Sequence, residues 1–435
     1  MARTFARFLG LAGLALLLGG AGAAWAEEAE FTLKTETGTA RLAPVTPVPA
    51  HVKARPAKGL PKFACLKPLF FEVKLGPKQL PFLLVLDSAK GVEQGYDRLF
   101  VDANGDGSLS GEQPFEGTCS TNRGFTTGMF LGCKLQIKYR DGEQPWAFNA
   151  QYTISQDGNN RSQPSLSVTA AGQCEGTVDF GGKKLKVALV DGDTNGCFSD
   201  LYAAPKAAPG TPTGANTAPP SGDWILVDAN GDGQFDAEAM GLEAFGCGKY
   251  LIVDGKCYEV NLSASGRKVS VAPSTAPCGT LKRAGEGPFS VALLTPSHGM
   301  LAVCSAGEPV SVPAGLYKLL TCVTALEDDA KALWRATGRA NAAAKAFKVE
   351  EGKTTVVKFG APLKVGATAA VYPSGSVDAL KADNTVRLSL DIKGEGGEEY
   401  GASSITKAGA RVPPPAVTIL AKGGKEVASG SFQYG

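Results

Sequence analysis

The sequence predicts a mostly-β protein: several small antiparallel β-sandwich or barrel-like modules with calcium-loop insertions, ending in an immunoglobulin-like module. Three observations favour this class. Short runs rich in β-branched and aromatic residues recur between Gly, Asp, Asn and Pro. Helix signals are rare, with one clear candidate segment. The heptapeptide VDANGDG occurs twice, at Val101–Gly107 and Val227–Gly233, each time at the end of a strand-like run.

The N-terminus has the pattern of a secretory signal peptide. Two arginines precede an apolar run that is too short to span a membrane, and Ala24-Trp25-Ala26 forms an A-x-A cleavage signal. We expect residues 1–26 to be removed. The mature chain, from Glu27, should be secreted or periplasmic and should not span a membrane.

Strand signals dominate the rest of the chain. Asp254-Gly255 stands between two strand-like runs and predicts a two-residue hairpin turn. The clearest runs are Pro81–Leu86, Lys134–Tyr139, Lys183–Val190, Tyr250–Val253 and Cys257–Leu262.

The helix candidate is Ala325–Phe347, which is Ala-rich and places apolar residues at helical spacing. Gly338 lowers its helix propensity. A pair of strands around the sequence WRATG is the alternative.

Composition changes indicate the domain boundaries. Residues 203–222 are low in complexity and rich in Pro, Ala, Gly and Thr, so we expect an exposed linker there. The expected divisions are a Pro-rich tether at 27–62, β modules at 63–118, 119–202 and 223–274, a β-sandwich-like module at 275–360 and an immunoglobulin-like module at 361–435.

Charge and cysteine content limit the partners and the compartment. The chain has 44 Lys and Arg and 42 Asp and Glu, and without the signal peptide it is close to neutral, which argues against binding to nucleic acid. Its ten cysteines never form a C-x-x-C pair. In an exported protein this favours up to five disulfides over a zinc site.

The repeated heptapeptide predicts cation binding. Asp or Asn at loop positions 1, 3 and 5, Gly at 6 and a carbonyl at 7 wrap oxygen ligands around a hard ion such as Ca²⁺. A divergent third loop begins at Asp191. The expected ligands are Asp102, Asn104, Asp106, Ser108, Ser110 and Glu112 in loop 1, Asp228, Asn230, Asp232, Gln234, Asp236 and Glu238 in loop 2, and Asp191, Asp193, Asn195, Cys197 and Asp200 in loop 3.

The loops depart from the EF-hand pattern at position 12, which is Gln113, Ala239 or Tyr202 instead of a bidentate glutamate. Strands, not helices, precede them. We therefore expect weak calcium affinity, of about 10⁻⁴–10⁻³ M, and a stiffening role. In the alternative interpretation, the polar residues only form turns and bond their own backbone.

The order of these blocks resembles a group of uncharacterised secreted bacterial proteins that carry EF-hand-like D-x-N-x-D-G calcium loops. The similarity covers most of the mature chain and is carried by VDANGDGSLSGEQPF, GGKKLKVALVDGDTNGCFSD, GDWILVDANGDGQFDAE, VPAGLYKLL, GGEEY with RVPPPAVTIL, and the closing GSFQYG. The resemblance implies an envelope location and calcium loops, and it implies no reaction.

The sequence favours a calcium-binding structural or ligand-binding envelope protein without catalysis. Its only histidines are His51 and His298, and the usual hydrolase and phosphate-loop motifs are absent. The alternative is a hydrolase, carbohydrate-active or other, with a carboxylate pair, either Glu112 with Asp87 or Glu259 with Asp254.

Envelope polysaccharide or protein is the partner class that this interpretation favours. The aromatic residues near loop ends that could act as sugar platforms are Tyr96, Trp146, Trp224 and Tyr258.

Overall fold

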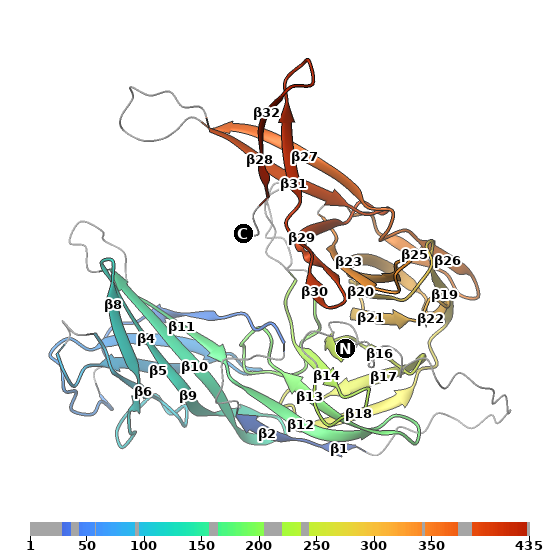
Figure 1. The fold of residues 1–435 in the computed structure, drawn as a ribbon. Helices are drawn as coiled ribbons and strands as arrows, with labels where there is room; N and C mark the ends of the chain where they lie inside the picture. Colours follow the sequence, from blue (N-terminus) through green and yellow to red (C-terminus); the bar gives the residue numbers. More distant parts are fainter. Residues whose placement is uncertain are drawn as a thin grey trace, which may run out of the picture.

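The structure, a computed structural model, is all-β wherever it is described (Figure 1). The described part of the chain contains no helix, and so none that could cross a membrane. The mostly-β prediction is confirmed. The residues described are 28–35, 43–56, 58–91, 95–155, 164–203, 220–235, 243–341, 344–372 and 385–432.

The largest N-terminal sheet is nearly closed into a barrel. Its strand order is β7-β6-β5-β4-β3-β11-β10-β9-β8, and only Gly117 separates the two edge strands, so the edges of the sheet meet. The strands are β3 (Val48–Val52), β4 (Leu69–Leu75), β5 (Leu80–Asp87), β6 (Arg98–Val101), β7 (Phe115–Glu116), β8 (Thr118–Asn122), β9 (Phe125–Tyr139), β10 (Gly142–Ser155) and β11 (Ser165–Ala170).

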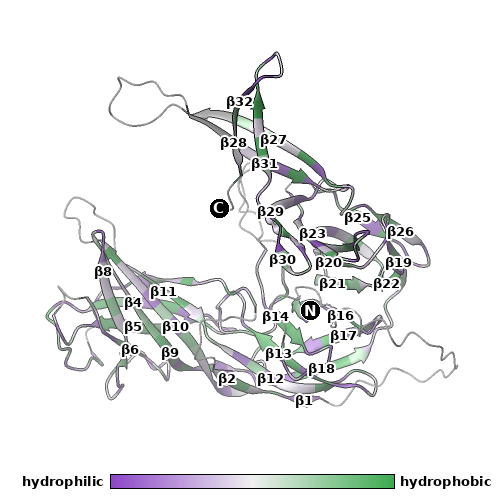
Figure 2. Ribbon diagram, in the orientation of Figure 1, coloured by the Kyte–Doolittle hydropathy of each residue, from purple (hydrophilic) through white to green (hydrophobic). Residues whose placement is uncertain are grey.

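Alternation along the long strands explains the core of this sheet. In β9, buried Phe130, Leu135 and Ile137 alternate with exposed residues, as period-2 geometry requires. Figure 2 shows the corresponding mixture of hydrophobic and hydrophilic residues along β9 and β10. Trp146 and Tyr152 of β10 fill the same core.

Two smaller sheets follow, and the five-stranded one carries both the second and the third loop, after β14 and β13. In the four-stranded sheet the hairpin prediction at Asp254-Gly255 is confirmed, because Val253 pairs with Lys256 and both turn residues have positive φ. The sheet orders are β15-β14-β13-β12-β2 and β1-β18-β17-β16. Their strands are β1 (Ala29–Glu30), β2 (Thr32–Thr35), β12 (Gly172–Asp179), β13 (Lys184–Val190), β14 (Trp224–Val227), β15 (Ala244–Gly246), β16 (Tyr250–Val253), β17 (Lys256–Leu262) and β18 (Lys268–Pro273).

The C-terminal part has a second large sheet, in which β21-β20-β23-β24-β29-β28-β27 follow one another, β25 pairs with β23 and β30 pairs with β29. The strands of a three-stranded sheet of order β22-β19-β26 alternate with it along the chain, and β31 and β32 form a separate hairpin. The strands are β19 (Cys278–Arg283), β20 (Phe289–Thr295), β21 (Gly299–Ser305), β22 (Val310–Pro313), β23 (Gly315–Glu327), β24 (Leu333–Arg339), β25 (Phe347–Val349), β26 (Thr354–Val357), β27 (Lys364–Tyr372), β28 (Thr385–Lys393), β29 (Glu399–Lys407), β30 (Ala410–Arg411), β31 (Ala416–Leu420) and β32 (Glu426–Ser431).

The helix predicted at Ala325–Phe347 is wrong, and the alternative of two strands is confirmed. β23 pairs with β24 around a short turn, and β24 also pairs with β29. Tertiary pairing on both sides of β24 outweighs the helix propensity of the alanines.

The pairing of β24 with β29 also crosses the expected boundary between residues 360 and 361. Strands β27 to β29 therefore extend the sheet that contains β20 to β24. The domain divisions otherwise remain predictions, and the signal peptide and most of the linker lie outside the described residues.

The structure joins none of the ten cysteines in a disulfide, although all ten lie in the described part of the chain. Cys133, Cys174, Cys247 and Cys322 are at most 2% exposed. They act there as small apolar groups, three of them in one core cluster and Cys322 in another. The five expected disulfides are therefore absent from this structure.

Candidate metal centre

The three predicted loops share one turn geometry. The first aspartate of each loop accepts hydrogen bonds from the backbone amides at positions 5 and 6. These bonds measure 3.1 and 2.9 Å at Asp102, 3.1 and 2.8 Å at Asp228, and 3.1 and 2.8 Å at Asp191. All three aspartates are buried. This pattern fixes the loops and is common to ion loops and to simple polar turns.

In loop 1 the polar side chains mainly bond one another and the loop backbone. Asn104 Oδ1 accepts from the amide of Asp106, and Asp106 Oδ1 accepts from the amide of Ser108. Glu112 Oε1 accepts from the amide of Ala103 at 3.2 Å, so this expected ligand does face the loop. Ser110 is exposed.

Loop 2 repeats these bonds at Asn230, Asp232 and Gln234. The predicted ligands Asp236 and Glu238 lie outside the described residues. Buried Glu243 instead faces the loop, because its Oε1 accepts from the amide of Asn230 at 3.4 Å.

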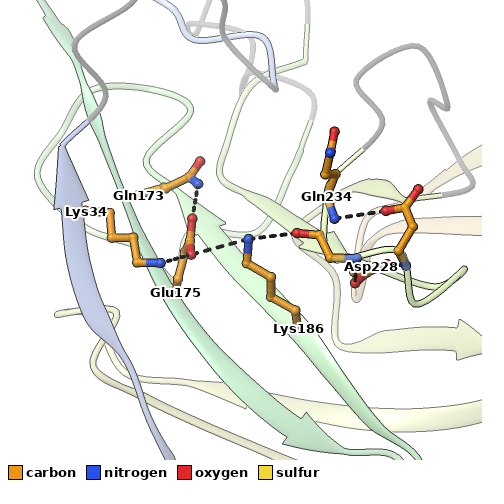
Figure 3. A network of polar contacts seen from close by, with 8 residues as sticks. Lys34, Gln173, Glu175, Lys186, Asp228 and Gln234 are labelled. Atoms are coloured by element: carbon orange, nitrogen blue, oxygen red, sulfur yellow. Dashed lines mark hydrogen bonds and ion pairs between the residues drawn. The ribbon is translucent and has the colours of Figure 1, made fainter.

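Lysine side chains also contact loop 2. Lys186 Nζ donates to the carbonyl of Gly233 at 3.3 Å and lies 3.5 Å from a carboxylate oxygen of Glu175, which also bonds Lys34 (Figure 3). Lys183 Nζ donates to the carbonyl of Ala229 at 3.3 Å. Two ammonium groups thus bond loop 2 carbonyls, which lowers the negative potential there.

Loop 3 contains the strongest candidate for a metal centre. Carboxylate oxygens of Asp191, Asp193 and Asp223 all lie within 4.8 Å of one another. Asp191 and Asp223 are 0% exposed. Across the described residues, no other group of three His, Cys, Asp or Glu side chains converges in this way. The sequence predicted the first two residues and missed Asp223.

Close backbone approach brings the third carboxylate to the loop. Asp223 Oδ1 accepts from the amide of Gly192 at 3.0 Å, and its Oδ2 accepts from the amide of Asp200 at 2.6 Å. A Cβ atom at Gly192 would overlap the carbonyl oxygen of Gly222, so this position requires glycine. Asp200 also accepts from Asn195 Nδ2 at 2.8 Å. The predicted loop residues Asn195 and Asp200 therefore border the cluster.

The electrostatics of the cluster are unfavourable without a positive charge. Burial, followed by repulsion from neighbouring carboxylates, raises the pKa of Asp191, Asp193 and Asp223. Within the described residues no lysine or arginine forms an ion pair with any of the three. Asp193 Oδ1 is buried and has no hydrogen-bond partner there. Buried carboxylates are usually paired or bound to a metal.

The donor chemistry at this centre is oxygen. Cys197, whose carbonyl was predicted as a ligand, and Cys247 carry thiols whose pKa is raised by burial and by the nearby carboxylates. Such thiols remain protonated at neutral pH and are poor metal ligands. Carboxylate, amide and carbonyl oxygens suit hard cations.

The aromatic residues that the sequence suggested as sugar platforms do not lie on the surface. The proposed sugar platforms are buried, with Tyr96, Trp146, Trp224 and Tyr258 between 1% and 6% exposed, so they belong to the core. That prediction is wrong, because large aromatic rings near strand ends stabilise sheets by burial.

The carboxylates considered for the hydrolase alternative bond other groups. Asp87 is buried and accepts from the amides of Ala64 and Cys65, whereas Asp254 and Glu259 form ion pairs with Lys183 and Lys249. These contacts provide no observation that favours a hydrolase.

Comparisons with protein-family models, with curated proteins and with solved structures find no match to this chain. The chemistry of the centre is therefore inferred from its own residues.

Proposed function

We propose that this chain is a secreted or periplasmic cation-binding β-protein in which Ca²⁺ joins loop 3 to the segment that begins β14. The single observation that carries the proposal is the convergence of Asp191, Asp193 and Asp223, two of them fully buried, with no basic partner among the described residues. A divalent cation would offset both the desolvation cost and the mutual repulsion of these carboxylates.

The choice of Ca²⁺ follows from the donor set. Three carboxylates from loop 3 and from the residue before β14, with Asn195 nearby, provide oxygen ligands of the kind that Ca²⁺ binds in variable geometry, whereas Mg²⁺ needs a near-ideal octahedron. The physiological role that fits is structural: the ion stiffens the loop region of an envelope protein that presents its surface to polysaccharide or protein partners.

Calorimetric titration with CaCl₂, combined with thermal unfolding with and without chelator, tests the proposal. Wild-type protein should bind Ca²⁺ and melt at a higher temperature when loaded. Asp193→Asn should lose the binding heat of this centre and most of the rise in Tm. Asp254→Asn, which changes an exposed ion-paired aspartate, is the matched control and should keep both. If Asp193→Asn binds Ca²⁺ as wild type does, the proposed centre is wrong.

A further inference from the structure

Strands β4 to β7 and β12 to β15 form two equivalent units. Each unit is a four-stranded antiparallel meander with its strands in sequence order. The register is also equivalent: Leu84 pairs with Val101 in one unit, and Val187 pairs with Val227 in the other. The two VDANGDG copies thus follow equivalent strands, as expected of an internal duplication.

The equivalence extends to the metal centre. Asp97 precedes β6 as Asp223 precedes β14. The amide of Ala89 donates to Asp97 Oδ1 at 2.8 Å, and the amide of Gly192 donates to Asp223 Oδ1 at 3.0 Å. Asp97 is therefore the counterpart of Asp223.

Charge differs at the two remaining positions. The same register makes Ser88 the counterpart of Asp191 and Lys90 the counterpart of Asp193. Lys90 Nζ lies 4.0 Å from Asp97 Oδ2. The first unit thus places the ammonium group of Lys90, a side chain that is 72% exposed, within ion-pair distance of the shared aspartate. The second unit places there a carboxylate whose Oδ1 is buried without a partner among the described residues.

We propose that the two units use different cations at one architectural position: the side-chain ammonium of Lys90 in the first unit and a bound divalent metal ion in the second. This inference rests on the proposed function, and it adds that the metal ion in the second unit has the role that the Lys90 ammonium has in the first. A lysine at residue 193 would then supply in cis the positive charge that the wild-type centre takes from solution.

Charge replacement at residue 193 tests the inference, with Asp193→Lys compared with the matched neutral variant Asp193→Met. In chelator, Asp193→Lys should melt at a clearly higher temperature than Asp193→Met. When CaCl₂ replaces the chelator, neither variant should gain stability from this centre. Equal melting temperatures of the two variants in chelator, with wild type still binding Ca²⁺, would overturn the inference alone. Absence of any Ca²⁺ response in wild type that depends on Asp193 would overturn the proposed function and the inference together.

The reciprocal change provides a readout independent of folding defects in the second unit. Ser88→Asp combined with Lys90→Asp should add one Ca²⁺-binding equivalent in calorimetry, because it recreates the three-carboxylate arrangement around Asp97. Lys90→Met alone should add none. An unchanged stoichiometry in the folded double variant contradicts the inference.

Discussion

The indole Nε1 of Trp146 donates a hydrogen bond of 3.0 Å to Asp191 Oδ2, which links the core of the barrel-like sheet to the metal centre. Trp146 is 1% exposed and stacks on Phe148. A cation bound to Asp191 would thus lie close to a rigid indole.

This contact makes Trp146 an optical reporter of the centre. We expect Tb³⁺, a luminescent substitute for Ca²⁺, to show emission sensitised by tryptophan excitation, and Ca²⁺ to compete it away. Asp193→Asn should abolish most of this signal, whereas Asp254→Asn should preserve it. Full sensitised emission from Asp193→Asn would place the bound ion elsewhere.

The raised pKa values predict an unusual pH dependence of the metal-free protein. Burial raises the pKa of Asp191 from 3.8 to about 8, so between these values the folded state holds a proton that the unfolded state has lost. The unfolding free energy in chelator should therefore fall as pH rises from about 4 to about 8, by up to about 1.4 kcal/mol per pH unit for such a group.

Urea unfolding at several pH values in chelator measures this dependence. Saturating Ca²⁺ should flatten the profile above neutral pH, since metal binding displaces the proton. A stability in chelator that rises steadily across this pH range would contradict the assigned burial of uncompensated carboxylates.

The two identical loops give a separate prediction. Asp102→Ala with Asp228→Ala removes an acceptor for two backbone amides in loop 1 and for three in loop 2, which should cost about 1–3 kcal/mol per loop even in chelator. If loops 1 and 2 also bind Ca²⁺, as the sequence predicts, calorimetry should lose two weak equivalents while the equivalent at Asp193 remains.

Circular dichroism of this double variant should retain the β signature, because the strands pair independently of these side chains. Unchanged stability of the double variant in chelator would show that the loop hydrogen bonds contribute little. Loss of stability with an unchanged calcium stoichiometry would identify these aspartates as turn-formers only.

Local patterns explain why the strands could be predicted. Tyr250–Val253 and the Asp254-Gly255 turn follow from residue type alone, since β-branched runs and an Asp-Gly pair have one favoured geometry. The Ala325–Phe347 segment was ambiguous, because its alanines suit a helix and its alternation suits a strand. Pairing of β24 with the distant strand β29 decided it.

The centre was only partly predictable because it is non-local. Asp191 and Asp193 belong to one loop motif. Asp223 is distant from them in sequence, and only the folded sheet brings its carboxylate close to theirs. A signal was present: an aspartate precedes both strands that lead into VDANGDG, at Asp97 and at Asp223. Glu243 was missed for the same reason: it directly precedes β15, and the pairing of β15 with β14 brings it to loop 2.

The most direct test of a cation at Asp191, Asp193 and Asp223 is a crystal structure of the protein grown or soaked with a lanthanide or Ca²⁺, analysed by anomalous difference density. We expect a peak between these three carboxylates, within bonding distance of their oxygens, that is absent from crystals of Asp193→Asn. Well-ordered wild-type loops with no density among the three carboxylates at millimolar metal would contradict this expectation.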